Sequence, residues 1–169
     1  MKNRTYWLII AALCLVIGLG GGALLHRGTQ QEQAPDFTVE DRSGEKVSLR
    51  SLRGSPVIVN FWASWCGPCQ AEMPEFEEAY KQYGDDIVFM MVNLTDGRSD
   101  TRESADAVIA EGGYTFPVYY DTTGEAANAY GINAIPVTLF IDTHGKLLYQ
   151  KTGMMDAAEL QSWIDTLLN

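Results

Sequence analysis

Cysteine, histidine and basic residues are scarce in this chain. It has three cysteines and two histidines among 169 residues, and Cys14, His26 and His144 are scattered along it. A structural zinc site takes about four cysteine or histidine ligands held close together, so this set excludes one. Lysine and arginine number 12 against 22 aspartates and glutamates, a formal net charge of −10. That excess of negative charge argues against nucleic acid or anionic lipid as a partner, and we expect no metal or other cofactor.

One long run without charged side chains lies near the N-terminus. Residues 7–25 contain no charged residue, and a helix of that length reaches about 28 Å, enough to cross the hydrocarbon core of a bilayer. Lys2 and Arg4 precede the run and Arg27 follows it, so the positive-inside rule places residues 1–6 in the cytoplasm. A cleaved signal peptide is the alternative, but its apolar part is usually only ~7–15 residues and no small-x-small cleavage site follows the run.

These observations divide the chain into four parts. We expect a cytoplasmic N-terminus at residues 1–6, a retained transmembrane anchor at 7–25, a polar tether at 26–34 and one globular domain at 35–169. The domain has an ordinary length for a single folding unit. It would lie on the extracytoplasmic side of a single-pass membrane protein, and Cys14 would lie inside the anchor.

Strand patterns recur along the domain. The near-continuous apolar runs at residues 57–62 and 87–92 are typical of strands that are buried on both faces of a sheet. Two shorter runs, at residues 37–39 and 46–49, flank a polar turn and predict a hairpin. Further strands are expected at residues 116–120, 137–141 and 146–150.

Helices are expected between these strands, at residues 66–83, 99–111 and 125–130 and at the C-terminus. Ser99 or Asp100 is the expected cap of the second helix, which a Gly-Gly pair beginning at Gly112 ends. Asp156 and Glu159 predict a capping box for the last helix. Strands that alternate with helices and end in a hairpin indicate a three-layer α/β domain with a mixed sheet.

The most informative motif is Trp-Cys-Gly-Pro-Cys at residues 65–69, directly after the first buried strand. A Cys-x-x-Cys pair at a helix N-terminus has a depressed thiol pKa and exchanges disulfides. A purely structural disulfide is the alternative. Its stabilising effect grows with the length of the closed loop, and this loop is very short. The motif therefore favours redox chemistry.

The motif and its surroundings resemble the thioredoxin fold and, more closely, the membrane-anchored TlpA/ResA-like thiol–disulfide oxidoreductases. The matching stretches are residues 34–37 (APDF), 59–69 (VNFWASWCGPC), 116–118 (FPV) and 131–138 (GINAIPVT). The resemblance implies a thioredoxin-like three-layer fold with a mixed central sheet and an N-terminal hairpin. It also implies a helix–strand insertion at about residues 101–120, and a transmembrane helix before the domain.

The resemblance further implies roles for individual residues. Cys66 is expected to attack a substrate disulfide, and Cys69 to resolve the mixed disulfide that results. Pro136 matches the family's cis-proline, which lies beside the dithiol. The residues expected to contact substrate are Trp65, Gly67, Pro68, Ile135 and Pro136.

An acid–base partner for the thiols must also be found. Plain thioredoxin has a buried carboxylate where this chain has Asn60. Glu72, one helical turn after Cys69, matches an active-site glutamate of the ResA-like group and would exchange a proton with that thiol. Asp96 falls near a second acidic position of the group and is a candidate second acid. Glu77, like the glutamates near it, is expected on the solvent face of the helix.

The leading hypothesis is a reductase of disulfides in exported proteins, such as apocytochrome c during cytochrome c biogenesis. Because the extracytoplasmic space is oxidising, a transmembrane electron donor is expected as a partner. The alternatives are a dithiol oxidase or isomerase and a non-catalytic anchored scaffold. A peroxiredoxin-like thiol peroxidase is a further alternative, but its Pro-x-x-x-Thr-x-x-Cys pattern is missing, since Val59 and Ala63 stand at the Pro and Thr positions before Cys66.

Overall fold

Residues 33–169 are the part of the chain that the computed structural model describes. The expected cytoplasmic N-terminus, the expected anchor at residues 7–25 and most of the tether lie outside these residues. Between residues 33 and 169, no helix combines the length and the apolar character needed to span a bilayer.

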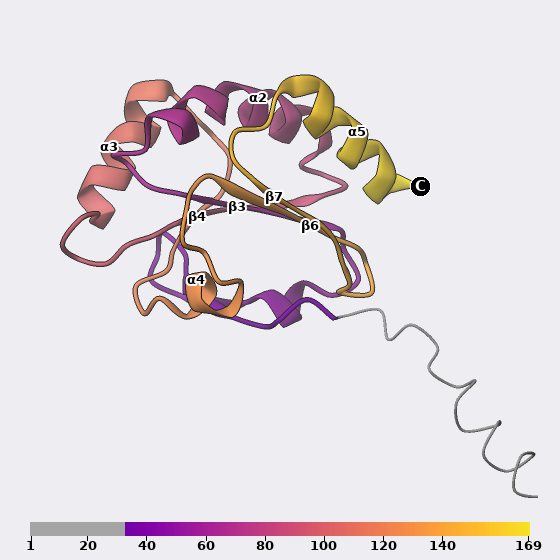
Figure 1. The fold of residues 1–169 in the computed structure, drawn as a ribbon, viewed down its shortest axis with the longest axis horizontal. Coiled ribbons are helices and arrows are strands. Elements are labelled where there is room, and N and C mark those ends of the chain that lie inside the picture. The colour runs from indigo at the N-terminus through magenta and orange to yellow at the C-terminus, as the bar shows by residue number, and fades with distance from the viewer. Residues whose placement is uncertain (1–32) are drawn as a thin grey trace, which may run out of the picture. The chain divides into compact units, whose positions relative to one another are not determined.

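Seven strands of the described chain form one mixed sheet in the order β2-β1-β5-β4-β3-β6-β7 (Figure 1). Their bounds are β1 Thr38–Glu40, β2 Lys46–Ser48, β3 Val57–Trp62, β4 Val88–Asn93, β5 Val118–Tyr120, β6 Val137–Ile141 and β7 Leu147–Thr152. Strands β3, β4 and β5 are parallel to one another, whereas β1 and β2 on one side and β6 and β7 on the other pair antiparallel. The predicted N-terminal hairpin and mixed sheet are confirmed.

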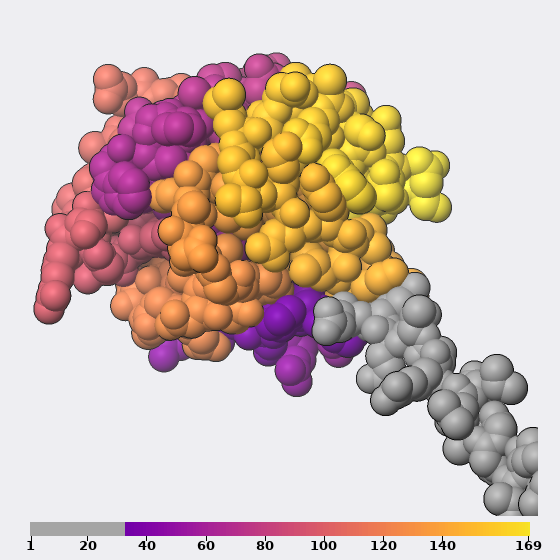
Figure 2. Space-filling model, viewed as in Figure 1, coloured from indigo at the N-terminus to yellow at the C-terminus, as the bar shows by residue number. Residues whose placement is uncertain are grey.

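Helices cover both faces of this sheet. They are the short 3-10 helix η1 Leu49–Leu52 and the α-helices α2 Gly67–Tyr83, α3 Arg102–Gly112, α4 Glu125–Ala129 and α5 Ala157–Leu168. Figure 1 shows α2, α3 and α5 on one face and α4 on the other, so the three-layer prediction is confirmed. In the space-filling view of Figure 2 the described part of the chain presents a continuous surface across these layers.

The central strand β3 divides the core between the two faces. Ile58 and Trp62 pack toward α2 and α5, whereas Val59 and Phe61 pack on the opposite side near α4. This alternation follows from the two-residue period of a strand. Asn60 lies between Ile58 and Trp62 in that period and therefore faces α2, the helix that carries the cysteines.

The cap predicted for α3 is wrong. Thr101, not Ser99 or Asp100, is the N-cap: its hydroxyl accepts from the Ser104 amide, and the Ser104 hydroxyl accepts from the Thr101 amide in return. The predicted end is confirmed, because Gly113 closes α3 in the left-handed region at a φ of 66°. Asp100 is buried and bonds to other partners.

The capping box predicted for α5 is only half formed. Asp156 is the N-cap and accepts from the Glu159 amide at 2.8 Å. The Glu159 carboxylate, however, accepts from Lys151 Nζ at 3.0 Å. The Glu159 carboxylate therefore pairs with a lysine of strand β7 and not, as the sequence pattern predicted, with the backbone at the helix start.

The expectation that Glu77 lies in solvent is also wrong. The residue is 5% exposed, and its carboxylate accepts from the amide and hydroxyl of Thr115, both at 2.7 Å, and from the Phe116 amide at 3.3 Å. Burial alone would raise the pKa of Glu77, but these hydrogen bonds outweigh it and lower the pKa below its ordinary value. Glu77 thus attaches α2 to the loop that leads into β5.

Candidate active site

The two cysteines of the motif lie where β3 gives way to α2. Cys66 is the N-cap of the helix, and its Sγ accepts from the Cys69 amide at 3.2 Å. The two residues are joined by a disulfide, and both are buried. When the disulfide is reduced, a thiolate on Cys66 would face the free amides and the positive end of the helix dipole, which lower a thiol pKa.

The residues around the disulfide are more exposed than the sulfurs. Gly67 and Pro68 form the first positions of α2 and are both exposed. A proline suits the first turn of a helix because its missing N–H would have no partner there. Trp65 precedes the disulfide with 62% of its surface exposed. Trp65, Gly67 and Pro68 therefore form an exposed rim beside the buried sulfurs, and their contact with a substrate stays a prediction.

The second side of the site comes from the start of β6. The Ile135–Pro136 peptide bond is cis, as the resemblance implied, and Pro136 is buried. Val137 pairs with Phe61, so β6 brings Pro136 alongside the end of β3 and the cysteine loop. The surface between them is hollowed into a cavity of about 340 Å³, lined by Trp65, Leu94, Ile132, Asn133, Ala134 and Ile135.

Glu72 lies one helical turn beyond Cys69 on the same face of α2 and is 1% exposed. Its Oε1 accepts from Asn60 Nδ2 and its Oε2 accepts from the Met155 amide, both at 2.8 Å. Burial raises the pKa of Glu72 to about 7, although the two hydrogen bonds act in the opposite direction. The carboxyl group can therefore both take and release a proton near neutral pH.

Asp96 lies in a different environment. It is exposed, and its Oδ1 accepts from the amides of Arg98, Ser99 and Asp100 at 2.8, 2.6 and 3.0 Å. These backbone hydrogen bonds lower the pKa of Asp96 to about 2, so it stays ionised at neutral pH. Its carboxylate holds the loop after β4, and its role as a second acid stays a prediction.

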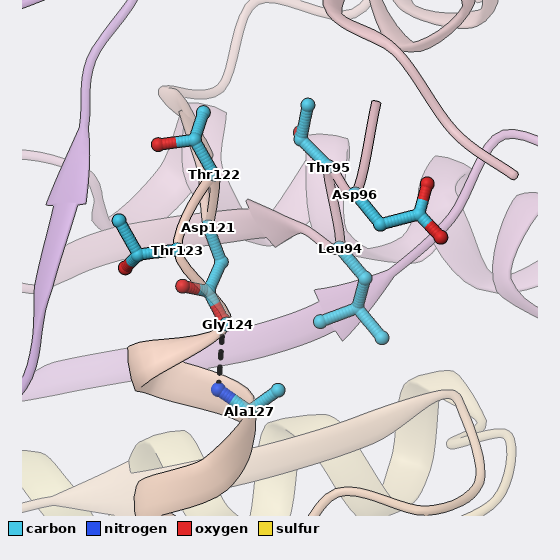
Figure 3. Close-up of a pocket in the computed structure, with 8 residues that line it drawn as sticks. All are labelled: Leu94, Thr95, Asp96, Asp121, Thr122, Thr123, Gly124 and Ala127. Atoms are coloured by element: carbon cyan, nitrogen blue, oxygen red, sulfur yellow. Dashed lines mark hydrogen bonds between the residues drawn. The ribbon is translucent and has the colours of Figure 1, made fainter. Parts of the chain in front are cut away.

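Asp96 lines a second cavity, also of about 340 Å³, at the carboxyl ends of β4 and β5 (Figure 3). Leu94 lines both this cavity and the one at Trp65. The buried carboxylate of Asp121 points toward the start of α4, where it accepts from the amides of Ala126 and Ala127. Among residues 33–169 no cluster of three or more histidine, cysteine, aspartate or glutamate side chains has the geometry of a metal site.

The contacts that two residues of the site make could not be predicted from the sequence. Asn60 marked a missing acid, but the structure adds that its amide contacts Glu72. Asp100 was expected only as a helix cap, yet it bonds to Ser64 in the loop before the cysteines. The only signal for this contact in the sequence was the place of Asp100 in the loop after β4, the strand beside β3.

Comparisons with known proteins agree with this geometry. The profile of the AhpC/TSA family matches residues 31–150. Thioredoxin-like protein YneN of Bacillus subtilis is 32% identical over 166 residues, which cover 94% of this chain and 96% of that protein. Thiol-disulfide oxidoreductase ResA of Halalkalibacterium halodurans is 29% identical over 177 residues, with 98% and 97% covered.

Solved structures of similar proteins have the same fold. StoA from Bacillus subtilis superposes with a TM-score of 0.67 at 30% identity, covering 79% of this chain and 99% of that one. The exposed lipoprotein thioredoxin Etrx1 from Streptococcus pneumoniae superposes with a TM-score of 0.63 at 32% identity, covering 77% and 98%.

Proposed function

The chain belongs to the AhpC/TSA family and is a thiol–disulfide oxidoreductase of the ResA/StoA type, and on that basis we propose that it reduces disulfides in exported proteins from the outer side of the cell membrane. The observation that carries the proposal is Glu72, a buried carboxyl group with a pKa of about 7 one turn from Cys69. In the reducing direction this group takes the proton that the second thiol must lose before it attacks, and in the oxidising direction it would return that proton.

The first step of the proposed reaction uses Cys66. Its thiolate attacks one sulfur of the substrate disulfide, an S–S bond forms between Cys66 and that sulfur, and the other substrate sulfur leaves as a thiolate. Trp65, Ile135 and Pro136 would hold the substrate chain beside the sulfur during this attack. The product is a mixed disulfide between enzyme and substrate.

The second step uses Cys69. Glu72 in its ionised form takes the Cys69 proton, and the new thiolate attacks Cys66 to form the Cys66–Cys69 disulfide. The second substrate sulfur is released as a thiol or thiolate. The substrate has then gained two electrons and the enzyme has lost two, so a reduced dithiol on a partner protein must restore the enzyme.

The proposed location rests on the sequence of the N-terminal segment. Residues 7–25 are uncharged and long enough to cross a bilayer, and the charges before them favour an extracytoplasmic domain. In that oxidising compartment, the partner dithiol would receive its electrons through the membrane. Apocytochrome c, whose haem-binding thiols must be reduced, is the substrate that the family resemblance suggests first. Protease treatment of intact protoplasts tests the location, because only an extracytoplasmic domain would be digested.

Trapping tests the chemistry. In the full-length Cys69→Ala variant the mixed disulfide on Cys66 cannot be resolved, so exported proteins with disulfides should remain attached and be identified by mass spectrometry. The matched variant Cys66→Ser should retain nothing, since it lacks the attacking sulfur. Capture that is equal in the two variants, or absent in both, would contradict the proposed chemistry.

The reduction potential tests the direction. A reductase should have a potential near that of thioredoxin, about −270 mV, whereas a value near that of DsbA, about −120 mV, would favour the dithiol oxidase instead. The Gly-Pro pair between the cysteines, the same as in thioredoxin, supports the reducing direction. Peroxide-dependent turnover that persists in Cys69→Ser would instead favour the peroxidase.

A further inference from the structure

A buried carboxylate that takes no part in the reaction above contacts the loop before the cysteines. Asp100 lies between β4 and α3 and is 1% exposed. Its Oδ2 accepts from the Ser64 amide at 2.6 Å and from Asn93 Nδ2 at 2.9 Å. Its Oδ1 accepts from the hydroxyls of Ser64 and Ser104 at 2.7 and 2.6 Å and from the Thr101 amide at 3.0 Å. One carboxylate thus joins three separate segments of the chain.

These bonds fix the orientation of one residue in the cysteine loop. Asp100 holds the amide and the hydroxyl of Ser64, and the Ser64 carbonyl accepts from Gln70 Nε2 in the first turn of α2. The backbone on both sides of Ser64 is therefore held. Since Trp65 follows directly and Cys66 comes next, the direction in which the chain approaches the helix is set at Ser64.

The position of Trp65 depends on the hydrogen bonds between Asp100 and Ser64 more than the position of the two cysteines does. Cys66 and Cys69 are buried and belong to the start of a helix, whereas Trp65 is mostly exposed. An exposed indole has few packing contacts of its own, so its position follows from the backbone beneath it. That indole forms one wall of the cavity beside Ile135.

We propose that Asp100 is a positioning residue for disulfide exchange, which holds Ser64 so that Trp65 forms the wall of the cavity where a protein substrate lies. The inference rests on the proposed function in one respect, that a protein substrate occupies this cavity. Asparagine at position 100 would place an N–H where a carboxylate oxygen now accepts hydrogen bonds. If the N–H replaces Oδ2, the Ser64 amide loses its acceptor. If it replaces Oδ1, the Ser64 hydroxyl can turn to accept from it, but the Thr101 amide loses its acceptor and the Ser64 amide then bonds to a neutral oxygen. Either arrangement weakens the hold on the loop, because bonds to a charged acceptor are stronger and a buried donor without a partner is destabilising.

The test compares two kinds of substrate in full-length protein. A small aromatic disulfide such as dithiobis-nitrobenzoate needs only the Cys66 sulfur, whereas insulin must also lie against Trp65. For Asp100→Asn we expect kcat/KM for insulin reduction to fall about tenfold, mostly through KM. The rate with the small disulfide should stay within about twofold of the wild type.

Two serines on the same carboxylate supply the matched control. Ser64→Ala removes a bond on the cysteine-loop side and should raise the KM for insulin about threefold. Ser104→Ala removes a bond on the α3 side and should lower the thermal midpoint without changing the ratio of the two rates. This pair decides the matter even if Asp100→Asn does not fold.

Three results would overturn the inference: equal slowing on both substrates, no slowing of insulin reduction in folded Asp100→Asn, or the same rate ratio in Ser64→Ala and Ser104→Ala. Failure of the wild-type protein to reduce insulin, with normal reaction of the small disulfide, would contradict the proposed protein substrate. It would also remove the basis of the inference for Asp100. The two failures are distinguishable because the second is seen without any substitution.

Discussion

Asn60 Nδ2 donates a hydrogen bond of 2.8 Å to Glu72 Oε1 in the core between β3 and α2. The same amide group also donates to Thr138 Oγ1 at 3.1 Å, and the other Glu72 oxygen accepts from the Met155 amide. No cation is among these partners, so burial dominates and raises the pKa of Glu72 to about 7. The polar group on β3 therefore positions the Glu72 carboxyl without adding a charge of its own.

The first prediction concerns the second step of exchange. Glu72→Gln should slow the decay of the mixed disulfide about 100-fold, because a general base is lost, while formation of the mixed disulfide changes little. In the wild type the decay rate should rise as pH increases through about 7, since only the ionised carboxylate takes the Cys69 proton. Rapid-quench measurement from pH 5 to 9 checks both. A wild-type profile without an inflection near 7, or an inflection that persists in Glu72→Gln, would contradict the role of Glu72.

The second prediction adds a charge to the Asn60–Glu72 pair. In Asn60→Asp two carboxyl groups would share one buried site, and two like charges so close cannot both ionise readily. The inflection in mixed-disulfide decay should move to a higher pH by about one unit or more. Thr138→Val is the control, because it removes a partner of Asn60 without adding a charge and should move the inflection far less. Equal shifts in the two variants would mean that charge is not the cause.

The third prediction concerns stability. Glu72 has a pKa of about 7 in the folded protein against an ordinary value of 4.5, so between these pH values the folded state binds more protons than the unfolded state. The contribution of Glu72 to the free energy of unfolding therefore falls as pH rises through that window, by on the order of 3 kcal/mol.

Urea unfolding of the wild type and of Glu72→Gln at pH 5 and pH 8 isolates this contribution. The free energy of unfolding of the wild type minus that of Glu72→Gln should be larger at pH 5 than at pH 8, because glutamine does not titrate. A difference that is independent of pH would show that the folded protein does not hold Glu72 largely protonated at pH 5–7.

Much of the fold could be predicted because each central element has a strong local pattern. Residues 57–62 form an apolar run that only Asn60 interrupts, and β3 occupies the same positions. The start of α3 was missed because Ser99, Asp100 and Thr101 are all good caps in sequence. In the structure the Asp100 carboxylate accepts hydrogen bonds from Ser64 and Asn93. Partners outside the helix leave no signal in the sequence around its start.

The same reason limits the prediction of the site. The cysteines are identified directly by the fixed spacing of their motif, whereas the cis-proline was predicted from the resemblance of residues 131–138 to the family. The roles of Glu72 and Glu77 were not separable by periodicity, because both lie on α2 among other glutamates. What distinguishes them is the neighbour each one meets. Glu72 meets two donors, Asn60 and Met155, while Glu77 meets three at Thr115 and Phe116.

The last prediction separates the second buried carboxylate of α2 from the chemistry. Glu77→Gln would remove the negative charge that accepts from Thr115 and Phe116. The new N–H can donate to the Thr115 hydroxyl, which turns to accept it, but the two backbone amides then bond to a neutral oxygen instead of a carboxylate. Hydrogen bonds to charged groups contribute ~1.5–3 kcal/mol each, and we expect the free energy of unfolding to fall by about 2 kcal/mol. Both exchange rates should stay at the wild-type values, because Glu77 contacts neither the cysteine loop nor Glu72.

Glu78→Gln is the matched control for Glu77→Gln, since Glu78 also pairs with Lys81 but is largely exposed. An exposed ion pair contributes at most about 1 kcal/mol, so this variant should unfold close to the wild type in urea. Equal destabilisation by the two substitutions would mean that the bonds to Thr115 and Phe116 contribute little. A loss of exchange rate in Glu77→Gln alone would instead mean that the loop before β5 helps to shape the active site, because Glu77 is what attaches that loop to the helix of Cys66 and Cys69.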